Sequence, residues 1–369
     1  MKITKLIKAV GVAVALCLPI VGATQTLRYN TFMPPLALET KGIQQFFVDL
    51  KAATDGRVKG QVFVGGQMLG GQATLSGIRD GVVDGGFIIP TLNASEIPYV
   101  AMLPELLPFA SNFWAATGAT NETIMLNCDE CRADLDKYKA VWLGGIGASP
   151  WYMMCRQPIS SVDDLHGKKI RVTGGFAIRM ISALGATAVS LPASEIPAAM
   201  QQGVIDCAVG TLSWLNTLGL SNMVKGVIDE PFGSYHGIGQ FVFNKNSLAK
   251  LSAADRKVLM EMIPKYLAKL NGAYAADEQK ARKVGEEKGI KFWKPDAKFD
   301  AIMAAFRAKE PQAVAKDIVS QGGSADAERI VRAHIATLDK WNKLVANVDG
   351  DTDAFAALLQ QQIYSKLQH

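Results

Sequence analysis

Histidine is scarce in this sequence, and the residue patterns that mark several classes of exported enzyme are missing. The four histidines, His166, His236, His334 and His369, are scattered along the chain. There is no H-E-x-x-H pair and no G-x-S-x-G elbow, which excludes the helix-borne zinc site of metalloproteases and the nucleophile turn of α/β-hydrolases. The glycine-rich stretch at 65–71 lacks the Lys-Ser/Thr ending of a phosphate loop. We therefore expect a protein that is not an enzyme and that has no cofactor or metal site.

A strong net charge is missing too, and so is any long apolar run beyond the first residues. The chain has 39 basic and 34 acidic residues, an excess of +5. Three lysines lie within the first eight residues, and without them 36 basic residues stand against 34 acidic ones, an excess of only +2. This balance gives no argument for nucleic acid or for an anionic membrane surface as a partner. No later segment reaches the roughly 20 apolar residues of a membrane span, so we expect the chain to work in solution.

The first residues have the pattern of a secretory signal peptide. Basic residues precede an apolar run over residues 9–21, which ends at the small-residue cleavage pattern Val21-Gly22-Ala23. The run is shorter than a membrane span, and polar residues follow it. We expect residues 1–23 to be removed during export and the mature chain to start at Thr24.

Cysteine is also sparse. Cys17 lies inside the apolar run rather than at the cleavage pattern, which argues against a lipid-modified cysteine at the mature end. Cys128 and Cys131 are separated by two residues, as in some zinc and redox sites. A zinc site would need two more ligands, however, and a thioredoxin-type site would need a βαβ context. In an exported chain we expect a local structural disulfide here, with free thiols and metal or redox chemistry as the alternatives.

Strand and helix patterns alternate in the first half of the chain. Ile43, Phe46, Phe47 and Leu50 follow the spacing of one apolar helix face, and Gly56 ends that helix. The expected elements are strands at 27–32, 58–64 and 82–89 and helices at 43–53 and 73–79. The same alternation recurs over 169–209. This pattern predicts an α/β fold with two mostly parallel sheets in two lobes, and a ligand site in the cleft between them at the carboxyl ends of the strands.

Helical patterns dominate from Ser252 onward. Ser252 is a good N-cap for a long helix that reaches about Gly289, and Pro264 predicts a kink in it. Further helices are expected at 301–306, 325–345 and 352–367.

One arginine has the surroundings of a ligand anchor. Arg171 ends a strand within the apolar and small-residue segment Ile170 to Gly175. The planar guanidinium presents a fork of donors that matches a carboxylate. Taken alone the pattern is also compatible with a solvated or salt-bridged arginine, which is the ordinary role of an arginine at a strand end.

Several stretches together resemble one family. In the second half they include Ile170-Arg171-Val172 with the residues before it from Pro158, then Leu184-Gly185-Ala186, and Glu195 to Asp206. Similar segments are found at 66–70, 78–84 and 243–252. Over about residues 27–340 the chain resembles the solute-binding proteins of tripartite ATP-independent periplasmic (TRAP) transporters, the DctP-like family.

The resemblance implies a two-lobed periplasmic binding protein that closes as a hinged trap, with a long helix crossing both lobes and a helical carboxy-terminus. The expected division is 24–149 with 239–277 for lobe I, 150–238 with 278–340 for lobe II, and 341–369 for a terminal helical extension. The expected function is capture of a small organic acid in the periplasm. The expected partners are the small and large TRAP membrane subunits, which carry out uptake driven by an ion gradient rather than by ATP.

The resemblance also implies roles for single residues. Arg171 matches the family's arginine that forms a bidentate salt bridge with the substrate carboxylate. Trp151 stands where many relatives have a second arginine, and Gly210 stands where many have an asparagine, so we expect a less highly charged ligand, a monocarboxylate with an apolar or aromatic body. Gly174 is small at a position that is polar in the family, which indicates a roomier pocket.

Three further residues are expected to line the pocket. Phe32 and Ile89 follow strands of the first lobe, and Trp214 lies in the second; ordinary core packing is the alternative for each. Cys155 and Cys207 are expected to lie near each other in the second lobe, although the spacing does not establish a bond.

Two other functions remain open from the sequence. A binding protein that feeds a sensor or an ATP-driven importer would share the fold, and an exported hydrolase or lyase with an unrecognised site is the rival from another class. The identity of the acid, a metal ion bound with it and a homodimer are left open as well.

Overall fold

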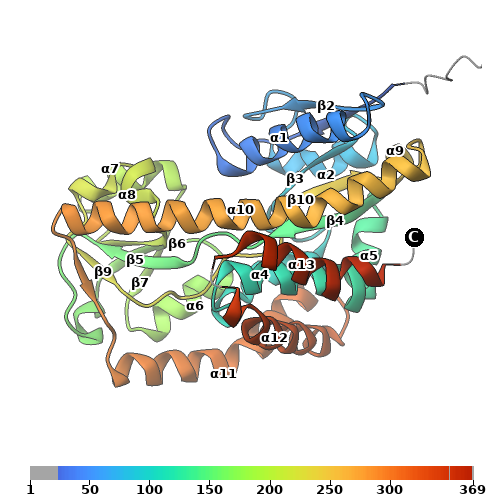
Figure 1. Cartoon of the computed structure of the whole chain (residues 1–369). Helices are drawn as coiled ribbons and strands as arrows, with labels where there is room; N and C mark the ends of the chain where they lie inside the picture. The colour runs from blue at the N-terminus through green and yellow to red at the C-terminus, as the bar shows by residue number, and fades with distance from the viewer. Residues whose placement is uncertain (1–23, 349, 368–369) are drawn as a thin grey trace, which may run out of the picture.

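A computed structural model describes residues 24–348 and 350–367. The predicted signal peptide lies outside the described residues. Two separate mixed sheets form two lobes, and one long helix crosses both of them (Figure 1). This arrangement confirms the expected two-lobed α/β fold.

The first lobe is built on a five-stranded sheet with the order β2-β1-β3-β10-β4. Strands β1, β2 and β3 are parallel, whereas β10 is antiparallel to both of its neighbours, β3 and β4. The strands are β1 Gln25–Asn30, β2 Val58–Phe63, β3 Gly85–Ile88, β4 Ala140–Ile146 and β10 Ile238–Asn244. The three opening strands confirm the alternation predicted from the sequence.

The second lobe has a six-stranded sheet with the order β11-β9-β5-β8-β6-β7. Strand β6 is parallel to β7 and β8, and β5 is antiparallel to β8 and β9. The strands are β5 Trp151–Cys155, β6 Lys169–Val172, β7 Thr187–Ser190, β8 Cys207–Thr211, β9 Gly226–Ile228 and β11 Lys291–Trp293.

Helices cover the faces of both sheets. In α1 the side chains of Ile43, Phe46, Phe47 and Leu50 are all buried, as their helical spacing predicts. The other helices of the first lobe are α2 Gly71–Arg79, α3 Pro98–Glu105, α4 Phe113–Glu122, α5 Asp129–Asp136 and α9 Lys245–Ala249, and α1 itself spans Leu38–Ala53. Those of the second lobe are α6 Gly175–Ala183, α7 Ile196–Gln201 and α8 Trp214–Thr217.

Helix α10, Ala253–Glu287, has 35 residues and lies across both lobes (Figure 1). The Ser252 side chain caps it by accepting a hydrogen bond from the Asp255 backbone N–H at 3.0 Å. It contacts α1 and β4 in the first lobe and α8 in the second. The helix continues through Pro264 without a break, and the kink expected there stays a prediction. Pro264 is buried, and packing of its neighbours Ile263 and Leu267 against the first sheet offsets the lost backbone hydrogen bond.

Helix α11, Ala297–Ser320, forms a second connection between the two cores. Phe299 and Met303 near its start pack in the core of the second sheet, whereas Val314 and Ile318 near its end pack in the first lobe. The sequence analysis expects helix only at 301–306, and the structure extends it on both sides and through Pro311. Burial of both halves keeps the helix continuous through that residue.

The last helices return to the first lobe. Helix α12, Ala327–Leu344, packs on α4, and α13, Thr352–Gln362, packs on α10. Trp341 of α12 lies directly over Gly118, where an added Cβ would be 2.1 Å from the indole ring. The helical carboxy-terminus is therefore confirmed, while the lobe boundaries proposed from the sequence remain a prediction.

Two histidines are buried together: His236, in the segment between β9 and β10, and His334 of α12. The Nδ1 atom of His236 donates to the Ser234 carbonyl at 2.8 Å, so its Nε2 atom accepts from Nε2 of His334 at 3.1 Å. The Thr123 hydroxyl in turn donates to Nδ1 of His334 at 2.7 Å. Both rings are fully buried, and burial lowers the pKa of His236 to about 4 and that of His334 well below its usual value. The pair is therefore neutral at pH 7.

Two disulfides are present in the part of the chain that the structure describes. Cys128 is bonded to Cys131, which agrees with the expected local bridge. Cys155 on β5 is bonded to Cys207 on β8, directly opposite in the sheet register. All four side chains are buried.

We expect the two bridges to differ in how much they stabilise the fold. They join residues separated by 3 and by 52 positions. In the chain-entropy model a short loop contributes about 2 kcal/mol and a loop of ~50 residues about 4 kcal/mol. Urea denaturation should therefore show a larger loss of unfolding free energy for Cys155→Ala/Cys207→Ala than for the equally buried pair Cys128→Ala/Cys131→Ala. Equal losses would contradict this expectation.

Candidate functional site

Arg171 is buried in the second lobe, and no carboxylate of the described residues lies beside it. Strand β6 holds it in register with Ala208 of β8 and Val189 of β7, and it is only 4% exposed. Its Nε atom donates to the Leu191 carbonyl at 2.9 Å. Among the described residues, no carboxylate lies within 4.0 Å of its guanidinium nitrogens. Burial lowers the pKa of Arg171, yet arginine stays charged, so the site holds an uncompensated cation.

Trp214 lies against this cation. The guanidinium carbon of Arg171 is 5.3 Å from the centre of the Trp214 ring, within the range of a cation–π interaction. Gly210 of β8 makes this position possible, because an added Cβ there would be 2.0 Å from the indole. Three residues that the sequence singled out, Arg171, Gly210 and Trp214, are thus brought together by β6, β8 and α8.

Trp151 belongs to the same sheet, but the alternation along β5 places its side chain on the face opposite to Arg171 and Trp214. It is the first residue of β5 and pairs with Thr211, next to Gly210. Its ring stacks on Tyr235 with centroids 5.3 Å apart and planes 10° apart, and it contacts Phe176 at 5.8 Å. The sequence reasoning did not identify Tyr235, although an aromatic residue between Gly233 and Gly237 in a segment joining two sheets was a usable signal.

A cavity of about 370 Å³ lies between α3 of the first lobe and the start of α6. Gly174 lines this cavity. Its φ of +89° is a backbone conformation that favours glycine, so the backbone as well as the space in the cavity accounts for a glycine here. Tyr235 lines it too, and its hydroxyl is 3.1 Å from the Thr91 hydroxyl of the first lobe. Of the residues singled out from the sequence, only Gly174 borders this cavity.

An acidic side chain in this cavity wall links the two lobes. Glu105 at the end of α3 accepts a hydrogen bond from the Phe176 backbone N–H at the start of α6, at 2.8 Å. Arg179 of α6 lies 4.0 Å from Glu105 and pairs also with Glu310 and with Asp317 of α11. Burial raises the pKa of Glu105. This side of the site is therefore acidic, in contrast to the surroundings of Arg171.

Phe32 and Ile89 lie in the first lobe, just after β1 and β3. Phe32 is half-buried and its ring is 5.6 Å from that of Phe87. Ile89 precedes the short helix Pro90–Asn93, which carries Thr91. Both pack on the core of the first lobe, so their role as an opposite wall of the ligand site stays a prediction.

The described residues give no sign of a metal site or a membrane segment. No three His, Cys, Asp or Glu side chains in 24–348 and 350–367 are arranged to hold a metal ion. Within the same ranges, no helix combines the length and the apolar character that crossing a bilayer requires.

A comparison with curated proteins finds distant relatives. A solute-binding protein of Albidiferax ferrireducens is 22% identical over 224 residues, which cover 59% of this chain and 64% of that protein. The chain therefore matches slightly less than two thirds of the length of this relative.

Solved structures share the fold over most of their length. A TRAP solute-binding protein of Rhodoferax ferrireducens with copurified benzoate has a TM-score of 0.70 and 21% identity, covering 88% of this chain and 100% of that one. A Bordetella bronchiseptica protein with bound mandelate has a TM-score of 0.66 and 23% identity, covering 85% and 99%. A Citrobacter koseri protein with bound D-glucuronate has a TM-score of 0.57 and 23% identity, covering 80% and 99%.

A match to a family model shows the family of this chain. It describes the bacterial extracellular solute-binding proteins of family 7, named DctP, and it matches residues 29–316, well over half of the sequence. The match includes Arg171 with both strands beside it, and it agrees with the two-lobed fold. This chain therefore belongs to the bacterial extracellular solute-binding proteins of family 7.

Proposed function

We propose that this chain is the extracytoplasmic receptor of a TRAP transporter and that Arg171 anchors the carboxylate of its ligand. The observation that carries the proposal is a buried guanidinium with no protein carboxylate within 4.0 Å among the described residues. Buried charges in proteins are normally paired, because an isolated ion loses its hydration without compensation. A ligand carboxylate would supply the missing charge and accept two parallel hydrogen bonds.

The ligand is a monocarboxylate with an aromatic or apolar body. Trp214 offers a flat aromatic face directly against Arg171. A second carboxylate would meet Glu105 and Asp317 in the neighbouring cavity, and like charges there would oppose it. Relatives of this fold hold benzoate, mandelate or glucuronate, so the side chains of this site rather than the fold favour the aromatic acids.

The protein binds the acid and passes it unchanged to membrane subunits. Its family and fold are those of transport receptors, which capture a solute and do not convert it. Closure of the lobes around the acid would be driven by the contacts that only the closed form makes. Release of any product from a bound acid, followed by chromatography, would contradict this part of the proposal.

A thermal-shift screen tests the proposed function. The chain from Thr24 is melted with benzoate, mandelate, succinate, glucuronate or a neutral sugar. A ligand that binds only the folded state raises the melting temperature by mass action. We expect the largest shift with the aromatic monocarboxylates. A shift with neutral sugars alone, or with none of the acids, would remove the receptor assignment for acids.

Replacing Gly210 with alanine should weaken acid binding while the fold is kept. The new methyl group would displace the Trp214 ring from its place against Arg171. Loss of a cation–π contact of about 0.5–2 kcal/mol corresponds to binding roughly 2- to 30-fold weaker. Isothermal titration calorimetry measures the change, and Gly70→Ala is the control because an added Cβ there meets nothing within 4 Å. Unchanged affinity in Gly210→Ala would show that Trp214 does not support the anchor.

A further inference from the structure

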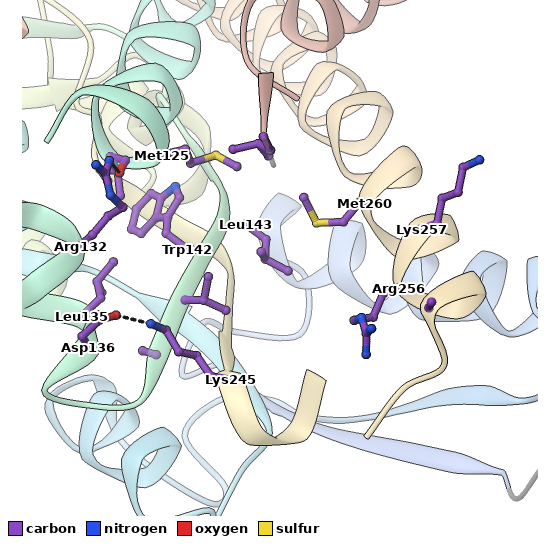
Figure 2. A pocket seen from close by; sticks show the side chains of 15 residues that line it. Met125, Arg132, Leu135, Asp136, Trp142, Leu143, Lys245, Arg256, Lys257 and Met260 are labelled. Atoms are coloured by element: carbon purple, nitrogen blue, oxygen red, sulfur yellow. Dashed lines mark hydrogen bonds and ion pairs between the residues drawn. The ribbon is translucent and has the colours of Figure 1, made fainter. Parts of the chain in front are cut away.

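A second cavity, far larger than the one near Gly174, lies on the first lobe. Its volume is about 790 Å³, and it forms an open groove between α5 and the start of α10, with β4 at its base (Figure 2). Pockets that hold small molecules have volumes of about 300–1,000 Å³, so this groove has room for one. None of the residues proposed for acid binding borders the groove, so it has no part in the site described above.

The base of the groove is closed by packed side chains. Ala140 and Trp142 of β4 are 0% and 3% exposed, and Leu135 of α5 is 2% exposed. The strand therefore offers no accessible backbone groups, and a molecule that enters the groove meets side chains.

The accessible apolar surface of the groove is formed largely by two methionines. Met125, in the turn Thr123–Asn127 before α5, and Met260 of α10 extend into the groove from its two sides, as Figure 2 shows. Both are partly exposed, and so are the lining residues Val141 and Leu367. A methionine side chain is unbranched and flexible, so it can adapt its shape to an aliphatic chain.

A basic rim borders this apolar surface. Figure 2 shows Arg132 and Lys245 on one side of the groove and Arg256 and Lys257 on the other. Among the described lining residues Asp136 is the only carboxylate, and it already pairs with Lys245. The rim therefore attracts an anion.

Arg256 has the donors that a carboxylate requires. It is exposed, and one of its Nη atoms donates to the Leu251 carbonyl at 2.7 Å. No carboxylate of residues 24–348 and 350–367 lies within 4.0 Å of its guanidinium, so the fork formed by Nε and the other Nη can take two parallel hydrogen bonds from a ligand. The neighbouring Lys257 pairs only with Glu261 at 3.9 Å, and such an exposed ion pair contributes little.

We propose that this groove is a second ligand site, which binds a single-chain aliphatic acid of medium length. The carboxylate of the acid pairs with Arg256 at the rim, and its hydrocarbon chain lies between Met125 and Met260. A protein partner fits less well, because a specific protein interface buries about 1,000 Å² or more and the partly exposed apolar side chains here are few. The proposal does not depend on the acid bound near Arg171.

Titration calorimetry with the chain from Thr24 tests this site, using hexanoate, octanoate and decanoate below their micelle-forming concentrations. Complete burial of one CH₂ group strengthens binding about fourfold, so in an open groove the affinity should rise about two- to fourfold for each added CH₂. Decanol, which lacks the charge, should bind at least tenfold more weakly than decanoate. Equal affinities of the three acids, or no saturable binding of decanoate, would overturn the proposal.

The titration is repeated in Arg171→Ala, so that acid bound in the cleft between the lobes does not contribute to the signal. We expect one decanoate per chain in this variant. Loss of decanoate binding in Arg171→Ala would place the acid in the cleft, which would overturn the groove proposal and leave the proposed function intact.

Matched charge reversals on one helix locate the site. Arg256→Glu/Lys257→Glu should weaken decanoate binding at least tenfold, whereas Lys280→Glu/Lys283→Glu, exposed residues of α10 outside the groove, should leave it unchanged. Equal weakening by the two double variants would show only a general effect of net charge and would overturn the proposal.

A change in the apolar surface tests the place of the hydrocarbon chain. Met260→Gln keeps the length of the side chain but adds a polar amide, so it should reduce the gain in affinity for each added CH₂. An unchanged gain would place the chain elsewhere and contradict the proposal. Cosedimentation of the protein with phosphatidylglycerol vesicles, without saturable binding of decanoate, would assign the basic rim to a membrane surface and would also overturn it.

Discussion

Arg171→Ala is expected to reduce acid binding by at least tenfold, and by much more if the pair is fully desolvated. Removing one partner of a buried charge pair costs about 2–5 kcal/mol, because the carboxylate would enter a site that no longer compensates its charge. Titration calorimetry with the best acid from the thermal screen measures the loss. Arg171→Lys should also bind weakly, since an ammonium cannot form two parallel hydrogen bonds to a carboxylate.

The ligand-free protein provides the control for this variant. Arg171 is 4% exposed and has no ionic partner among the described residues, so its removal should leave the ligand-free melting temperature unchanged or raise it. A variant that melts like the parent but no longer responds to the acid has lost the anchor and kept the fold. Wild-type affinity in Arg171→Ala would refute the anchor role.

Lowering the pH from 7 to 4.5 should destabilise the protein through its buried histidine pair. The folded-state pKa of His236 is lowered from 6.5 to about 4, and that of His334 is lowered as well. Between pH 6.5 and 4 the histidines of the unfolded chain therefore bind protons, whereas the buried histidines of the folded chain stay neutral. The histidine contribution to the unfolding free energy is complete above pH 6.5 and falls as the pH drops toward 4. For His236 alone the loss at pH 4.5 is about 2 kcal/mol by linkage. Urea denaturation at several pH values measures it.

Comparing variants separates the effect of the histidine pair on acid stability from the effects of other titrating groups. Buried carboxyl groups such as Glu39 and Glu278 have raised pKa values and act in the opposite sense, but they are the same in every variant. His334→Gln should reduce the slope of the unfolding free energy against pH by up to about 1.4 kcal/mol per pH unit. His166 is exposed, so His166→Gln serves as the control and should leave that slope unchanged. A His334→Gln slope equal to that of the parent would show that the pair does not control acid stability.

Local patterns predicted much of the fold, because the spacing of apolar residues within short segments indicates which segments form helices and which form strands. The helix face of Ile43, Phe46, Phe47 and Leu50 is buried as its spacing requires, and the alternation of strands and helices led directly to two α/β lobes. The local pattern alone left Arg171 as either a ligand anchor or an ordinary strand-end arginine, and it was the resemblance to the family that implied the anchor role. The sequence could not show that none of the described carboxylates pairs with this arginine.

The missed features depend on contacts between distant residues. Helix α11 runs through Pro311 because both of its ends are buried in different cores, which local rules do not register. The stacking of Tyr235 on Trp151 joins residues 84 positions apart in the chain, and the link from Glu105 to α6 spans 71 positions. A sequence pattern names candidate residues, but only the fold decides which of them meet.

The position of β10 sets an order for folding during synthesis. This strand lies between β3 and β4 in the first sheet, yet it follows the entire segment that forms β5 to β9 of the second lobe. When β4 has been synthesised, the strand that pairs with it in the described sheet, β10, has not yet been made, and the first lobe stays open in the middle. Domains made from one continuous segment can fold as they emerge, but this first lobe must wait until about residue 244 is available. The nascent amino-terminal half therefore exposes unpaired edges for as long as the second lobe takes to be synthesised, and this interval is when the chain is most open to aggregation or chaperone binding.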